Sequence, residues 1–114
     1  MPHRLEKINE LIKRELGRIL LEEGNFSPGV LVTILAVRTG ADLEEAAVTF
    51  SVLPANQCSK ILANLENRIF FLQQCLNKKL RMRPVPKIRF VLDETEGESQ
   101  KVETLLEKLR QENL

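Results

Sequence analysis

The first periodic pattern in the chain runs from Arg4 to Glu23, where apolar residues recur at spacings of three and four. That spacing places them on one face of an α-helix, so the sequence predicts an amphipathic helix here. Gly24 suits the left-handed position that ends many helices, and Pro28-Gly29 suits the centre of a type II turn. The apolar stripe comprises Leu5, Ile8, Ile12, Leu16 and Ile19, widened by Leu11 and Leu20.

Two strands are predicted after this turn. Val30 to Val37 is rich in β-branched residues and apolar at almost every position, which is typical of a strand covered on at least one face. Ala46 to Leu53 alternates instead, with Val48 and Phe50 on one side. The residues at 38–42 supply a turn, so we expect an antiparallel hairpin with a rather long connection.

A long helix is expected from about Asn56 to Leu80, where apolar residues again recur at helical spacing. Asn56 or Ser59 can accept hydrogen bonds from its first backbone amides. Phe70 and Phe71 widen the apolar stripe of this helix. The stripe comprises Ile61, Leu62, Leu65, Ile69, Leu72, Leu76 and Leu80.

A proline-containing connector joins this helix to a predicted strand at 87–92. Pro84 and Pro86 forbid helix continuation and stiffen the connector. In the strand, apolar residues alternate with Lys87 and Arg89, so both cations are expected on its solvated side. Residues 78–89, here called the basic joint, contain no acidic residue and six cations: Lys78, Lys79, Arg81, Arg83, Lys87 and Arg89. We interpret this concentration of charge as the working surface; a merely solvated rim is the alternative.

The charge reverses sign beyond the basic joint. Residues 93–98 are predicted to form an acidic loop, and a final helix is expected from Ser99 to Gln111. We hypothesise that this acidic segment shields the basic joint. The expected order is helix, strand, strand, helix, strand, helix. It predicts one α+β sandwich domain over residues 1–114, with a three-stranded sheet and helices packed on one face.

Composition agrees with a single folded domain. The chain has 114 residues, 43% hydrophobic and 29% charged, and its apolar runs fall far below the roughly 18 residues that span a membrane. The first residues lack the apolar segment of a secretory signal, so we expect a cytoplasmic protein, and a monomer. Cys58 and Cys75 lie about 25 Å apart along the predicted helix and cannot pair there. With a net charge of +1, any nucleic-acid contact has to come from locally placed cations.

The first predicted helix offers a second set of cations. Lys7, Arg14 and Arg18 align along one flank of its polar side. This helix has as many acidic as basic residues, and pairs such as Glu10 with Arg14 explain most of the pattern as ordinary surface ion pairs. A secondary RNA contact through the three cations is the alternative.

Recognisable catalytic chemistry is absent from the sequence. The single histidine, His3, lies near the chain start, and no phosphate-binding or nucleophile motif appears. Asp42, Glu44 and Glu45 cluster in the hairpin connection, but turn chemistry explains them more simply than a metal site. We therefore expect no enzyme activity, cofactor, metal, membrane contact or small-molecule substrate. A small hydrolase is the rival hypothesis that turnover assays would test.

Several motifs together resemble the bacterial ribosome-binding factor A family. The first helix opens on Arg4, and the hairpin is similar to the family's V-T-x-x-x-V followed by D-L and a strand, at residues 32–37, 42–43 and 47–52. The most specific segment is a helix ending in an L-R or M-R pair, then V-P, then a strand closed by aspartate. It is matched by LRMRPVPKIRFVLD at residues 80–93. The likeness covers nearly the whole chain.

The resemblance implies a type II KH-like fold and a role as a non-catalytic assembly factor. Members of the family bind immature small (30S) ribosomal subunits through 16S ribosomal RNA and assist late processing and maturation, notably in the cold. In place of the GXXG loop of other KH domains, the family has an Ala-x-Gly kink in the long helix. Here the aligned residues are Arg68-Ile69-Phe70. We therefore expect a straighter helix, with Arg68 either a phosphate contact or an ordinary surface residue.

We predict that cations neutralise RNA phosphates in a positioning role that carries little base information. The chain has no Trp or Tyr, and its five Phe are assigned mostly to the core, which argues against a base-stacking platform. The alternative is a protein-interaction module whose basic joint binds an acidic partner. The candidate RNA-binding residues are Arg81, Arg83, Lys87, Arg89, Lys78, Lys79, Arg68, Arg4, Lys7, Arg14 and Arg18.

Overall fold

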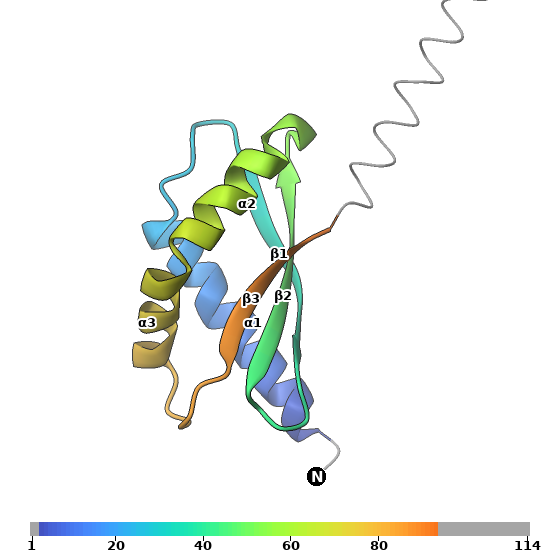
Figure 1. Ribbon diagram of the computed structural model, residues 1–114, viewed down its shortest axis with the longest axis vertical. Coiled ribbons are helices and arrows are strands. Elements are labelled where there is room, and N and C mark those ends of the chain that lie inside the picture. Colours follow the sequence, from blue (N-terminus) through green and yellow to red (C-terminus); the bar gives the residue numbers. More distant parts are fainter. Residues whose placement is uncertain (1–2, 94–114) are drawn as a thin grey trace, which may run out of the picture.

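The computed structural model describes residues 3–93 of the chain (Figure 1). The predicted acidic loop beyond Asp93 and the predicted helix at 99–111 lie outside the described residues. The elements, in order, are α1 (Arg4–Glu23), β1 (Leu31–Thr39), β2 (Glu45–Leu53), the short 3-10 helix η1 (Ala55–Gln57), α2 (Cys58–Asn67), α3 (Ile69–Lys79) and β3 (Lys87–Leu92). The first helix and the last strand have the predicted bounds.

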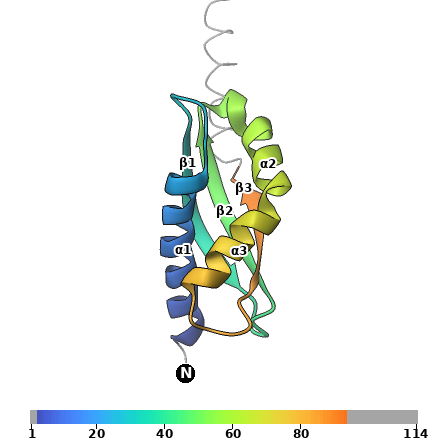
Figure 2. The same ribbon diagram turned by 90° about the vertical axis from the view of Figure 1, so that its left-hand side faces the viewer.

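The three strands form one mixed sheet in the order β1-β2-β3, with all three α-helices of the described part on one face (Figures 1 and 2). The predicted antiparallel hairpin is confirmed, since β1 pairs with β2 from Leu31 opposite Leu53 to Thr39 opposite Ala46. β3 runs parallel to β2, because α2 and α3 carry the chain back to the same end of the sheet. The α+β fold class is therefore confirmed.

The core lies between the sheet and the helices. Ile12 and Leu16 of α1 are fully buried, as is Phe50 at the centre of β2. The rings of Phe50 and Phe90 meet edge to face at a centroid distance of 6.0 Å and join the inner faces of β2 and β3. The alternation in β2 and β3 thus selects the packed face, and the opposite face of the sheet is open in the described part.

The prediction of one long helix from Asn56 to Leu80 is wrong, because the structure contains two helices that meet at Arg68. Arg68 has φ −102° and ψ 9°, which lies in a region open to any L-residue, so the break needs no glycine. Its guanidinium Nη1 donates a hydrogen bond to the carbonyl oxygen of Gly24 at 3.1 Å. Cys58 and Cys75 consequently lie in different helices, α2 and α3, and both thiols are free.

The turn after α1 is partly as predicted. Gly29 has φ 85°, and the Val30 amide donates to the Ser27 carbonyl at 3.1 Å, as a type II turn requires. The left-handed residue after α1, however, is Asn25, with φ 50°, whereas Gly24 keeps right-handed helical angles. The side-chain cap predicted at residue 56 or 59 is also absent, since α2 begins after Gln57 with no side-chain cap hydrogen bond.

Candidate nucleic-acid interface

The structure divides the basic joint between two faces of the molecule. Lys78 and Lys79 form the last turn of α3, on the helical side, and Arg81 follows them as an exposed residue. Lys87 and Arg89 are exposed on β3, whose intervening residues are buried under the helices, so these two cations point from the open face of the sheet. The expected solvated side of the strand is confirmed. The six cations do not share one surface.

The hydrogen bonds of the joint hold it rigidly against α3. Arg83 donates from Nη1 to the carbonyl oxygens of Leu80 and Met82, at 2.8 and 2.7 Å, so its guanidinium is partly used by the joint's own backbone. The Gln73 side chain donates to the Pro86 carbonyl at 3.1 Å and accepts from the Ile88 amide at 2.8 Å. The connector into β3 is therefore held by hydrogen bonds of its own Arg83 and of Gln73 on α3.

Two arginines of the open sheet face flank one alanine. Arg38 on β1 and Arg89 on β3 are the register partners of Ala47 on β2. Arg89 is already paired with Glu45, at 2.7 Å from Nε to Oε1, and both side chains are largely exposed. The sequence placed residue 38 in the predicted turn at 38–42, which is wrong because β1 continues to Thr39. Within the strand, a β-bulge at Leu35 shifts the alternation and turns Arg38 outward. The alternation pattern alone carries no signal for this bulge.

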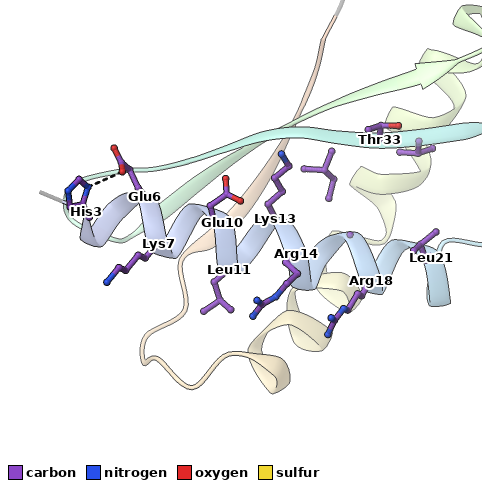
Figure 3. A pocket seen from close by; sticks show the side chains of 13 residues that line it. His3, Glu6, Lys7, Glu10, Leu11, Lys13, Arg14, Arg18, Leu21 and Thr33 are labelled. Atoms are coloured by element: carbon purple, nitrogen blue, oxygen red, sulfur yellow. Dashed lines mark hydrogen bonds and ion pairs between the residues drawn. The ribbon is translucent and has the colours of Figure 1, made fainter.

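The candidate cations of α1 lie along one side of the helix. Figure 3 shows Lys7, Arg14 and Arg18 on that side, while Glu10 points the other way, toward β1. Arg14 and Arg18 share a single carboxylate, that of Glu15, at 3.5 and 3.8 Å. The predicted pair of Glu10 with Arg14 is therefore wrong. Arg4 is exposed in the first turn of α1.

An open groove runs between α1 and the edge of β1, and its lining includes Lys7, Arg14 and Arg18. The groove has a volume of about 1110 Å³, and its rim mixes Glu6 and Glu10 with Lys13 (Figure 3). His3 at one end contacts Glu6 at 3.2 Å.

Within residues 3–93, no group of three or more His, Cys, Asp or Glu side chains is placed to hold a metal ion. Nor is any described helix long and apolar enough to cross a membrane.

Phe70 and Phe71 do not widen a buried stripe as predicted. They lie in the first turn of α3, where Phe70 is 76% exposed and Phe71 44% exposed. The Arg68 guanidinium carbon lies 5.3 Å from the centroid of the Phe71 ring. Arg68 is thus half-buried between this ring and α1, and is not part of a continuous helix. Two of the five phenylalanines are thus surface residues, because the buried face of α3 is formed by Leu72 and Leu76.

Solved structures with this architecture define the class of protein. Ribosome-binding factor A from Thermus thermophilus is similar with a TM-score of 0.66 and 22% identity, over 77% of this chain and 94% of that one. A homology model of the Thermus thermophilus factor, fitted into a cryo-EM map of a 30S complex, is similar with a TM-score of 0.63 and 23% identity, over 75% and 90% of the two chains. The fold is therefore the KH-like fold of these proteins.

Sequence relatives identify the family. The family model described as Ribosome-binding factor A matches residues 4–106. The ribosome-binding factor A of Coprothermobacter proteolyticus is 33% identical over 112 residues, which are 98% of this chain and 82% of the relative. That of Akkermansia muciniphila is 30% identical over 109 residues, 96% and 86% of the two chains. This chain belongs to the ribosome-binding factor A family.

Proposed function

We propose that this protein binds the small ribosomal subunit through 16S ribosomal RNA and assists its late maturation without catalysing a reaction. Family membership carries the proposal, since the family is described as a ribosome-binding factor. The Thermus thermophilus factor that shares this fold has been fitted into a complex with 30S.

The charge distribution supports a polyanionic partner. No acidic residue occurs between Asn67 and Leu92, so the end of α3 has no carboxylate close to it in the sequence. In the described part, Lys78, Lys79 and Arg81 have no ion-pair partner. Three unpaired cations within four residues can each neutralise a phosphate and release counterions. Such contacts position an RNA without specifying its bases.

Co-sedimentation with immature and mature small subunits across a salt series tests the proposal. We expect tighter binding to immature subunits, with an affinity that falls as salt rises. Replacing Lys78, Lys79 and Arg81 together by alanine should reduce the slope of log affinity against log salt by about two to three. The matched control replaces Lys13, Arg38 and Lys60, which lie on three different elements, and removes the same charge.

Equal losses in the two triple variants would show that only net charge matters and would contradict the assigned site. Failure of the wild-type protein to bind either form of the subunit would overturn the proposed function itself. Thermal melting of both variants checks that the fold is intact. The replaced side chains at the end of α3 are exposed, so we expect their removal to change stability little.

A further inference from the structure

Phe70 is the most exposed aromatic side chain in the described part of the chain. It is 76% exposed at the start of α3, although phenylalanine is among the residue types most often buried. Folding of this domain gains little from a ring in that position, since the core between sheet and helices is complete without it. The ring is therefore available to a partner.

The contacts of Arg68 fix the start of α3, the helix that carries Phe70. The hydrogen bond from Arg68 to Gly24 ties the start of α3 to the end of α1, and the Arg68 guanidinium lies 5.3 Å from the centroid of the Phe71 ring. Within residues 3–93, Phe70 has neither a ring partner nor a cation partner. Its neighbour is thus engaged, while the face of the Phe70 ring is free.

A polar and then basic stripe continues from this ring along α3. Phe70, Gln74 and Lys78 are spaced four residues apart, so they project from the same side of the helix, and all three are exposed. Lys78 lies about 12 Å along the axis from Phe70. No carboxylate occurs anywhere on α3. The stripe therefore combines one free aromatic face with one cation, Lys78, at its far end.

This combination fits one kind of partner. Grooves for single-stranded nucleic acid pair cations that track the phosphates with aromatic rings on which bases stack. A partner protein with an apolar pocket would not need the acid-free cationic stripe that adjoins the ring. Charge complementarity thus selects a polyanion that also offers flat aromatic groups, which is RNA with unpaired bases.

We propose that Phe70 stacks on an unpaired base of the bound RNA while Lys78 and Arg81 contact its backbone. The inference deepens the proposed function and rests on it for the source of the RNA. It also replaces the expectation, based on the sequence, that this protein lacks a stacking platform. The interface then prefers single-stranded segments over duplexes of equal charge.

Fluorescence gives a direct test, because the chain contains no Trp or Tyr. The variant Phe70→Trp is titrated with single-stranded oligoadenylate of about ten nucleotides and with a duplex of the same length. We expect strong quenching by the single strand and weak quenching by the duplex. Leu21→Trp, at an 88% exposed position on α1, is the control and should respond little to either RNA. Equal responses at the two positions would overturn the stacking contact.

Affinities separate stacking from general apolar contact. Phe70→Ala should weaken binding of the single strand by about 5- to 150-fold, whereas Phe70→Tyr should stay near wild type. Phe70→Leu keeps apolar bulk without a π face and should behave like Phe70→Ala. If Phe70→Leu binds small subunits as well as wild type while Phe70→Ala does not, the ring meets an apolar protein pocket and the inference is wrong.

The same variants distinguish this inference from the proposed function. Suppose that the wild-type protein and Phe70→Ala bind small subunits equally well, and that both also bind oligoadenylate equally well. The stacking contact is then overturned, and subunit binding stands. If oligoadenylate binding depends on Phe70 but no subunit is bound, the proposed function fails and the RNA contact stands. Circular dichroism melting should be unchanged in every Phe70 variant, because the side chain is exposed.

Discussion

The Arg68 guanidinium donates a hydrogen bond to the carbonyl oxygen of Gly24 across 44 residues of chain, at a distance of 3.1 Å. Gly24 ends α1, and Arg68 separates α2 from α3, so this contact joins the two points where the helical layer changes direction. It explains how a KH-like domain keeps a break between these helices when no glycine is present at residues 68–70. The Arg68 side chain, by bonding to Gly24, fixes the position of the break between α2 and α3, and no glycine conformation is needed for this.

We predict that Arg68→Met lowers the free energy of unfolding by about 1–3 kcal/mol, because the variant loses a hydrogen bond from a charged donor and a cation–π contact. Arg68→Lys should recover only part of this, since its ammonium does not reproduce the planar guanidinium. Urea denaturation measures both. The matched control is Arg81→Met, an exposed arginine without a hydrogen bond in the described part, which should change stability by less than about 0.5 kcal/mol.

Gln73 should be a stability determinant of the joint. Gln73→Leu leaves the Pro86 carbonyl and the Ile88 amide without their side-chain partner, which we expect to cost about 1–3 kcal/mol. Gln74→Leu is the control, since Gln74 is exposed and lies one position away on the same helix. Equal effects of the two changes in urea denaturation would show that the side-chain bridge contributes nothing specific. Faster amide exchange at Ile88 in Gln73→Leu would confirm its local role.

The two faces of the basic joint should contribute unequally to RNA binding. Arg81→Ala should reduce the slope of log affinity against log salt by about one, as loss of one phosphate contact does. Arg89→Ala should have a smaller effect, because Glu45 already pairs with that guanidinium. A larger loss for Arg89→Ala would move the interface to the open face of the sheet, where Arg38 also lies. The exposed Arg89–Glu45 pair itself should contribute only about 0–1 kcal/mol to stability.

The contribution of the α1 cations to RNA binding can be tested by removing the carboxylate with which Arg14 and Arg18 pair. Glu15→Gln removes the carboxylate that Arg14 and Arg18 share, so these arginines become available to phosphates. We expect RNA affinity to rise by about two- to fivefold at low salt, and the gain to vanish at high salt. Glu10→Gln makes the same change in net charge on the other side of α1 (Figure 3) and should have less effect. Equal gains would assign the effect to net charge alone.

Local pattern was sufficient for most of the fold. Helical spacing of apolar residues predicted α1 to the residue, and alternation in the segment after Pro86 predicted β3 and the outward direction of Lys87 and Arg89. These features depend on which face of a single element is apolar, and that information is contiguous in the chain. The concentration of cations at residues 78–89 is likewise a property of the sequence.

Contacts between distant segments decided the rest. Periodicity continues through Arg68, so only the tertiary structure, with the bond from Arg68 to Gly24, reveals the break between α2 and α3. The bulge at Leu35 arises where β1 pairs with β2, and it alone turns Arg38 outward. The helices pack on the sheet face that buries Ile88 and Phe90, which separates Lys87 and Arg89 from the cations at the end of α3. A sequence shows which residues share an element, whereas the pairing of elements determines which residues share a surface.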